Sequence, residues 1–151
     1  MKDGLYRETE KCEDVREIIV GFTCSAFDLL HPGHVAMLEE AKSQCYHLIV
    51  GLQTDPTIDR PTKNKPVQTT FERYMQLKAC KFVDEIIPYD TEEDLINLLK
   101  IIKPDIRILG KEYEQRPFTG SELPIRVYFN SREHNYSTTA LRERLAKNNA
   151  A

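Results

Sequence analysis

Apolar residues along this chain follow two alternating patterns, continuous runs and sets spaced three or four positions apart. Continuous runs are typical of strands buried in a parallel sheet, and spaced sets are typical of amphipathic helices. The runs predict strands at residues 17–23, 47–52, 84–88, 105–109 and 125–129. The spaced sets predict helices at residues 33–44, at 69 to about 81, after Thr91, and from 138 to about 147.

Capping residues mark several of the expected helix starts. Thr69 and Glu72 have capping-box spacing, and Thr91 and Ser137 are suitable N-cap residues. The first helix is expected to turn inward an apolar face formed by Val35, Met37, Leu38 and Ala41. The helix after Thr91 is expected to do the same with Leu95, Ile96, Leu98, Leu99 and Ile102.

The alternation of strands and helices predicts an α/β fold. We expect a Rossmann-like open, mostly parallel five-stranded sheet with helices on both faces, formed by one domain at residues 15–151. Residues 1–14 are polar without clear periodicity and are interpreted as a leader. Ligands of such sheets bind beyond the carboxyl ends of the strands. The segments expected there are 24–34, 53–68, 110–123 and 130–137.

The segment His31-Pro32-Gly33-His34 has the chemistry of a phosphate-binding helix start. Pro32 suits a first helical turn, and Gly33 lets a ligand approach the backbone. The unpaired N–H groups and the positive end of the helix dipole face the ligand. His31 and His34 are three positions apart, so both imidazoles can reach one anion. A histidine cap with a surface histidine, or half of a metal site, is the simpler alternative.

Two more segments with cations or hydroxyls are expected at the same edge of the sheet. The loop at 55–68 carries Arg60, Lys63 and Lys65 between prolines, and cations there can close over a polyphosphate. Arg132, followed by Ser137-Thr138-Thr139, makes an anion-binding corner at a helix start. An ordinary solvated loop and a simple helix cap are the alternatives.

Composition narrows the function classes. The chain of 151 residues has a formal net charge of −3, which argues against a broad nucleic-acid-binding surface. No apolar run reaches membrane-spanning length, so we expect no membrane association. The four cysteines form no Cys-x-x-Cys pair and are expected to be free thiols of a cytoplasmic protein. Cys24 lies beside the expected site. It is either a nucleophile or a small packing residue at the end of a strand.

These motifs resemble the HxGH nucleotidyltransferase superfamily, and within it the cytidylyltransferase family that includes bacterial glycerol-3-phosphate cytidylyltransferases. The likeness covers about residues 18–145. In the family's order, the matching motifs are Phe27-Asp28-Leu29-Leu30-His31-Pro32-Gly33-His34, Gln53-Thr54-Asp55, Lys63-Asn64-Lys65, Glu72-Arg73, Val83-Asp84-Glu85, Leu109-Gly110, and Arg132 with Ser137-Thr138-Thr139.

The resemblance implies a CTP-dependent cytidylyltransferase. The phosphate of a small phosphorylated metabolite would attack the α-phosphorus of CTP in line and release pyrophosphate. The product would be a CDP-activated precursor for surface polysaccharide synthesis. Mg²⁺ would be bound mainly through the triphosphate, with no direct protein ligand, and the enzyme would be a homodimer.

The resemblance also assigns roles to individual residues. The residues expected to stabilise charge at the transferred phosphorus and to grip phosphates are His31, His34, Lys63 and Lys65. Those expected to bind the nucleotide are Cys24, Ser25, Ala26, Phe27, Gly33, Asp55, Arg73, Gly110, Arg132, Ser137 and Thr138. Those expected to bind the acceptor are Lys111, Glu112, Tyr113 and Arg116.

The sequence departs from the family pattern in places, and these differences bear on the identity of the acceptor, on the nucleobase of the donor and on whether the chain is catalytic. The family's Gly-Asp-Asp-Trp is Gly110-Lys111-Glu112-Tyr113 here, so we expect an acceptor other than glycerol 3-phosphate. The same segment, with Thr119-Gly120-Ser121, resembles heptose adenylyltransferases, which leaves open an adenylyltransferase acting on a sugar phosphate. The family's Gly-Thr is Ser25-Ala26, which leaves open a non-catalytic nucleotide sensor.

Overall fold

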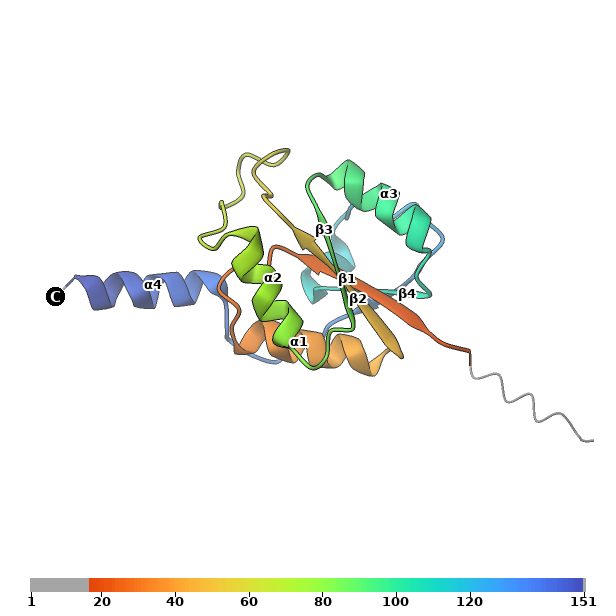
Figure 1. Cartoon of the computed structure of the whole chain (residues 1–151), viewed down its shortest axis with the longest axis horizontal. Coiled ribbons are helices and arrows are strands. Elements are labelled where there is room, and N and C mark those ends of the chain that lie inside the picture. Colours follow the sequence, from red (N-terminus) through yellow and green to blue (C-terminus); the bar gives the residue numbers. More distant parts are fainter. Residues whose placement is uncertain (1–16, 151) are drawn as a thin grey trace, which may run out of the picture.

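A computed structural model describes residues 17–150, and the expected strands form one parallel sheet in it (Figure 1). The strands are β1 (Val20–Ser25), β2 (His47–Gln53), β3 (Glu85–Tyr89), β4 (Ile106–Leu109) and β5 (Arg126–Phe129). Their order is β3-β2-β1-β4-β5, and every neighbouring pair is parallel. The predicted Rossmann-like sheet is confirmed. Its winding direction reverses between β1 and β4, where sheets of this kind bind ligands.

The helices start close to their predicted positions. They are α1 (Pro32–Ser43), α2 (Thr70–Ala79), α3 (Glu92–Ile102) and α4 (Thr138–Asn149). Thr69 and Thr91 complete capping boxes, and the N–H of Ala140 donates to Ser137 Oγ at 3.0 Å. A short 3-10 helix, η1 (Lys111–Gln115), was not predicted, because its polar sequence has no apolar periodicity.

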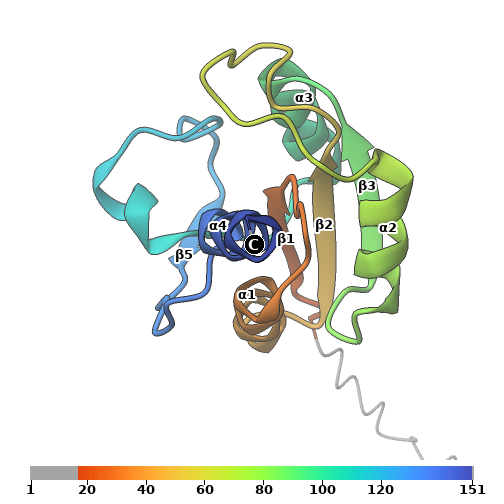
Figure 2. The same cartoon turned by 90° about the vertical axis from the view of Figure 1, so that its left-hand side faces the viewer.

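Two apolar clusters on opposite faces of the sheet hold the helices. One packs α1 and α2 through Leu38, Ala41 and Leu77 against β2 and β4. The other packs α3 through Leu95 and Leu99 against β1, β2 and β3. Successive residues of β2 alternate between the two clusters, as the pleat of a strand requires. Helices therefore cover both faces, and α1 and α3 lie on opposite sides of the sheet (Figure 2).

Two residues expected on inner helix faces lie elsewhere. Val35 is 37 % exposed, because it lies about 60° around α1 from the buried Leu38. On α3, Leu98 and Ile102 pack against the core as predicted, whereas Ile96 lies outside that cluster. The predicted inner faces were thus somewhat too wide.

Helix α4 runs away from the sheet, and the described chain buries none of its residues (Figure 1). Its first two turns contact the rest of the protein through Thr138 and Arg142. None of the described helices combines the length and apolar character needed to cross a membrane. The leader expected at residues 1–14 lies outside the described residues.

Candidate active site

Two adjoining cavities open at the carboxyl ends of the strands. The α3 cavity, of about 530 Å³, is lined by residues that include Gln53, Arg60, Lys63, Tyr89, Glu92, Arg107 and Thr119. The α1 cavity, of about 520 Å³, is lined by residues that include His31, Gly33, His34, Gly110, Asn130, Arg132, Ser137 and Thr138. The cavities meet at the ends of β1 and β4, where they share Cys24, Ser25, Leu109 and Tyr113.

His31 caps α1 and faces the α1 cavity. Its Nδ1 accepts a hydrogen bond from the N–H of Gly33 at 3.0 Å. The proton of the neutral ring is therefore assigned to Nε2, which lies 3.2 Å from Thr138 Oγ1. The Thr138 hydroxyl in turn donates to the carbonyl oxygen of Asp28 at 3.4 Å. These bonds join the start of α1 to the start of α4.

The His34 ring stacks on the His31 ring, with 3.9 Å between centroids, and contacts Phe27 edge-on. Its Nδ1 is buried and lacks a hydrogen-bond partner among residues 17–150. Burial, followed by the His31 ring, lowers the pKa of His34 to about 4. Burial also lowers the pKa of His31. Both imidazoles are therefore neutral near pH 7, so each carries one N–H donor, and that of His31 already faces Thr138 Oγ1.

The opposite wall of the α1 cavity is the segment after β5. Arg132 has a φ of 49°, and its guanidinium lies 3.6 Å from the carboxylate of Glu112. Gly33 lies beneath this wall, and a methyl group there would come within 2.9 Å of His134 and Tyr136. Glycine at this position therefore keeps the cavity wall close to the start of α1.

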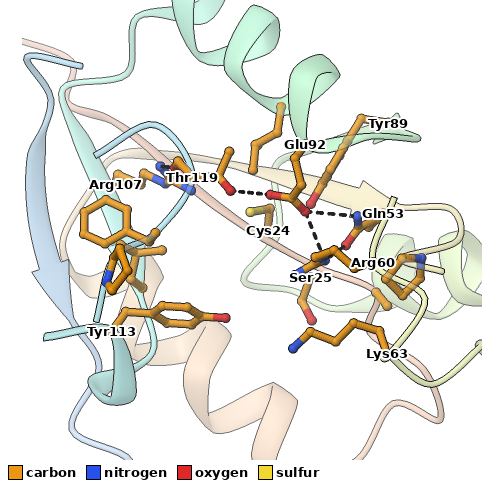
Figure 3. Close-up of a pocket in the computed structure, with 16 residues that line it drawn as sticks. Cys24, Ser25, Gln53, Arg60, Lys63, Tyr89, Glu92, Arg107, Tyr113 and Thr119 are labelled. Carbon is orange, nitrogen blue, oxygen red and sulfur yellow. Dashed lines mark hydrogen bonds and ion pairs between the residues drawn. The ribbon is translucent and has the colours of Figure 1, made fainter. Parts of the chain in front are cut away.

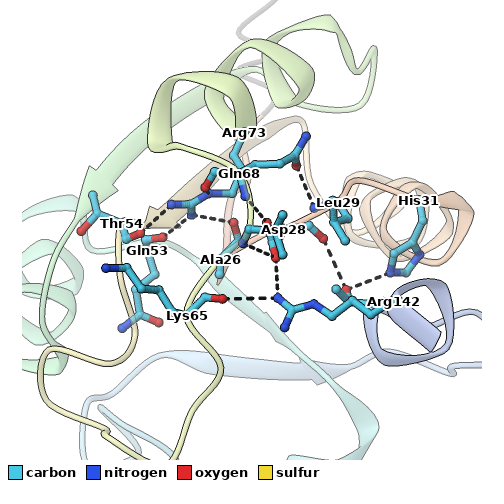
Figure 4. A network of polar contacts seen from close by, with 12 residues as sticks. Ala26, Asp28, Leu29, His31, Gln53, Thr54, Lys65, Gln68, Arg73 and Arg142 are labelled. Atoms are coloured by element: carbon cyan, nitrogen blue, oxygen red, sulfur yellow. Dashed lines mark hydrogen bonds and ion pairs between the residues drawn. The ribbon is translucent and has the colours of Figure 1, made fainter. Parts of the chain in front are cut away.

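A polar network holds the loop after β1 (Figure 4). Phe27 and Leu29 have φ values of 48° and 51°, which non-glycine residues rarely adopt. Between them, the buried Asp28 carboxylate accepts hydrogen bonds from the N–H groups of Val67 and Gln68 at 2.9 and 3.0 Å. These bonds fix the strained loop to the segment that precedes α2.

Arg142 completes this network, although sequence analysis did not single it out. It donates to the Asp28 carboxylate at 2.6 Å from the second turn of α4. Burial alone would raise the pKa of Asp28, but hydrogen bonds from the backbone and from Arg142 bring that pKa below its usual value. The available signal was the position of Arg142, four residues after Thr138 and hence on the same helix face.

Asp28 is expected to make protein stability depend on pH. Because its folded-state pKa is lowered, its stabilisation is complete above the unfolded pKa of about 4 and is lost as the pH falls below it. Asp28→Asn is expected to lower the free energy of unfolding at neutral pH by about 2–4 kcal/mol, because it breaks a largely buried ion pair. Urea unfolding at neutral and acidic pH measures both effects. If both proteins lost equal stability on acidification, Asp28 would not be the group responsible.

Arg73 bonds to the framework of the fold. It is 1 % exposed and donates to the carbonyl oxygens of Ala26, Gln53 and Thr54 at 2.5–2.9 Å. Gln53 is the last residue of β2, and Ala26 and Thr54 directly follow β1 and β2. Arg73 therefore fastens α2 to the edge of the sheet. It lines neither cavity. This placement favours a structural role for Arg73, and the expectation that it binds a phosphate group stays a prediction.

Glu92 is the centre of the polar cluster in the α3 cavity (Figure 3). Its carboxylate pairs with Arg60 at 3.0 Å and accepts hydrogen bonds from Gln53 and Thr119 at 3.3 and 2.5 Å. Arg60 also donates to Gln53 Oε1 at 2.7 Å. The cluster presents carboxylate, amide and hydroxyl groups, which suit a ligand rich in hydroxyls.

Arg107 is a buried cation in the same cavity. It is 3 % exposed, donates to the carbonyl oxygen of Thr119 and lies 5.3 Å from the Phe118 ring. Its Nε lacks a hydrogen-bond partner, and no ion pair with Arg107 occurs among residues 17–150. A buried charge without a counter-charge is unfavourable. The cavity is therefore suited to an anionic ligand.

The two lysines of the 55–68 loop are placed differently. Lys63 lines the α3 cavity, beside the polar cluster (Figure 3). The side chain of Lys65 is 78 % exposed and lines neither cavity; its Nζ lies 4.0 Å from Asp55. Asp55 also lies outside both cavities and accepts hydrogen bonds from Thr57. Of these three residues, the structure places only Lys63 in the lining of a cavity.

The residues after β4 also differ in whether they line a cavity. Tyr113 lines both cavities and Glu112 lines the α1 cavity, whereas the exposed Lys111 and Arg116 line neither. The expectation that Lys111 and Arg116 contact the acceptor stays a prediction. The 3-10 helix η1 causes this difference in placement, because successive side chains of a helix point in different directions.

Cys24 lies at the junction of the two cavities. Burial raises the pKa of its thiol, so the sulfur is protonated at neutral pH. The packing interpretation of Cys24 therefore agrees with its surroundings better than a nucleophilic role.

Comparison with known proteins agrees with this architecture. A family described as Cytidylyltransferase-like matches residues 22–144. The bifunctional protein HldE of Caulobacter sp. (strain K31) is 40 % identical over 111 residues, which are 72 % of this chain and 22 % of that protein. HldE of Helicobacter pylori (strain HPAG1) is 34 % identical over 144 residues, or 95 % of this chain and 31 % of that protein. This chain thus spans about a quarter of these relatives.

Solved structures show the same fold. The lipopolysaccharide core biosynthesis protein of Thermoplasma volcanium GSS1 superposes with a TM-score of 0.60 at 27 % identity, covering 75 % of this chain and 94 % of that one. A putative nicotinate-nucleotide adenylyltransferase of Vibrio parahaemolyticus has a TM-score of 0.58 at 13 % identity, covering 87 % of this chain and 89 % of that one. The family match covers most of the chain and both cavities. The chain belongs to the cytidylyltransferase-like family of nucleotidyltransferases.

Proposed function

We propose that this chain transfers a nucleotidyl group, preferentially the adenylyl group of ATP, to a sugar phosphate. The observation that carries the proposal is the junction of two different cavities at Ser25 and Tyr113. The α1 cavity, with its helix start and neutral imidazoles, suits a polyphosphate. The α3 cavity, with Arg107 and Glu92, suits an acceptor that carries a phosphate and several hydroxyls.

In the proposed reaction, an oxygen of the acceptor phosphate attacks the α-phosphorus of the nucleoside triphosphate. A phosphorus–oxygen bond forms there while the bond to the oxygen bridging the α- and β-phosphates breaks, and pyrophosphate leaves. His34 donates a hydrogen bond to the transferred group, where negative charge rearranges in the transition state. His31, whose Nε2 proton is directed to Thr138 Oγ1, stacks on the His34 ring and positions it. Neither imidazole needs to accept a proton, because the acceptor phosphate is already ionised.

Magnesium, in this proposal, enters with the triphosphate. Among residues 17–150, no three His, Cys, Asp or Glu side chains gather in a metal-binding group. Oxygens of the triphosphate would therefore supply most of the ligands of the ion, and the protein would supply few or none. When bound, the ion would neutralise charge on the leaving pyrophosphate.

The choice of ATP rests on the segments Gly110-Lys111-Glu112-Tyr113 and Thr119-Gly120-Ser121, which resemble heptose adenylyltransferases. The likeness to a lipopolysaccharide core biosynthesis protein supports a sugar-derived acceptor. CTP-dependent transfer is the second candidate, favoured by the description of the matching family.

The proposal is tested by incubating the protein with Mg²⁺, each of the four nucleoside triphosphates and a panel of sugar phosphates. We expect pyrophosphate release with ATP that depends on the sugar phosphate. Turnover with CTP alone would select the second candidate. Saturable nucleotide binding without turnover in any combination would support the non-catalytic sensor instead.

Lys63 and Lys65 provide a matched pair of variants. Lys63→Ala is expected to raise the KM for the sugar phosphate by about tenfold, because it removes a cation from the α3 cavity. Lys65→Ala is expected to leave that KM within about twofold, because its ammonium is exposed. Steady-state pyrophosphate release measures both. Equal effects would show that the loop closes differently around substrate.

A further inference from the structure

Asn130 is a buried amide that the mechanism above does not use. It follows β5, is 4 % exposed and lines the α1 cavity. Its Oδ1 and its Nδ2 both lack hydrogen-bond partners among residues 17–150. Its backbone N–H donates to the carbonyl oxygen of Leu109 at 2.8 Å, so the sheet fixes its position.

A buried side-chain amide with neither end bonded is unusual, because its lost hydration is not replaced. Among the described residues, the side chain could be exchanged for an apolar one of similar size without losing any hydrogen bond to the protein. A ligand that fills the cavity would supply the missing partners. It would need to offer a donor and an acceptor close together, because the amide presents one of each.

The neighbours of Asn130 show which part of a nucleotide would reach it. Glu40 accepts hydrogen bonds from the N–H of Ser131 and from the Tyr128 hydroxyl, both at 2.9 Å. Glu40 lies seven positions after Gly33 on α1, or roughly 10 Å along the helix. Asn130 lines the same cavity as the start of α1, so a nucleoside whose phosphates bind at that helix start can reach the Asn130 amide.

We propose that the Asn130 amide reads the amino-bearing edge of the donor nucleobase, an inference that rests on the proposed function. Oδ1 accepts a hydrogen bond from the exocyclic amino group, and Nδ2 donates to the adjacent ring nitrogen. Adenine and cytosine both present this pair of groups, and asparagine matches the adenine pair in a bidentate geometry. Asn130 thus contributes to donor selection in either candidate reaction.

The test combines Asn130→Leu with removal of the amino group from the nucleotide. Calorimetry measures the binding of ATP and of purine riboside triphosphate, which lacks the 6-amino group, to both proteins. We expect the wild-type protein to bind ATP about tenfold or more tightly than the analogue, and the variant to bind both nearly equally. CTP and its 4-deamino analogue form the parallel pair if CTP is the donor.

Two further measurements separate this role from a structural one. The melting temperature of the nucleotide-free variant is expected to be unchanged or raised, because Asn130→Leu removes a buried amide without partners. Asn97→Leu, on the exposed face of α3, is the matched control and is expected to keep the wild-type preference.

An unchanged preference in Asn130→Leu would overturn the proposal. The proposal would also be overturned if Asn130→Leu abolished the preference for nucleotides over their 2′- or 3′-deoxy forms and left the preference for the amino group unchanged. The amide would then bind the ribose. Because binding is measured without turnover, a protein that binds nucleotide through Asn130 but releases no pyrophosphate would refute the proposed function alone.

Discussion

Replacement of His34 by alanine is expected to lower kcat for nucleotidyl transfer by about a hundredfold or more. The neutral ring would donate a hydrogen bond that strengthens as charge rearranges on the transferred phosphoryl group. Its loss should therefore reduce kcat more than it raises the KM for the nucleotide. Steady-state pyrophosphate release at saturating substrates measures the effect.

The controls for this prediction are His34→Gln and His47→Ala. His34→Gln keeps a donor and is expected to recover part of the lost rate. His47 lies at the amino end of β2, 3.2 Å from Glu85, and its removal should leave kcat unchanged. A wild-type rate in His34→Ala would remove the imidazole from the mechanism.

Replacement of Arg107 by methionine is expected to raise the KM for the sugar phosphate by about a hundredfold. The variant removes a buried cation that has no counter-charge in the described chain. A charge-assisted hydrogen bond in such surroundings is among the stronger polar contacts of a protein, and losing it weakens binding substantially. Steady-state kinetics with varied sugar phosphate measure the change.

Protein stability distinguishes a binding role of Arg107 from a structural one. The melting temperature of Arg107→Met is expected to stay the same or to rise, because an apolar side chain replaces an isolated buried charge. Arg126→Met, on the exposed residue that begins β5, is the matched control and should change neither quantity. A large fall in melting temperature with an unchanged KM would assign Arg107 to the framework.

Helix starts were predictable because they depend on residues close together in sequence. Thr69 and Thr91 satisfy nearby N–H groups within their own first turns, and His31 does the same at α1. The placement of His31 and His34 in one cavity follows from their spacing on that helix. No long-range contact is needed to predict it.

The chemistry of the α3 cavity could not be predicted in the same way. Gln53 and Arg107 lie in strands that read as continuous apolar runs, and Glu92 reads as an ordinary residue of a first helical turn. A polar residue within a buried strand was a usable signal. What it faces depends on which strands and loops are neighbours.

The sequence by itself determined the alternating elements, the parallel sheet and the histidine-bearing helix start. The elements and the helix start follow from residue spacing within one segment, and the sheet follows from the alternation of elements along the chain. The tertiary structure decided which of Lys63 and Lys65 lines a cavity, that Arg73 bonds to the carbonyl groups at the ends of β1 and β2, and that Arg142 holds Asp28. These pairings join segments brought together by the packing of the whole sheet. Spacing within one segment carries no information about such contacts.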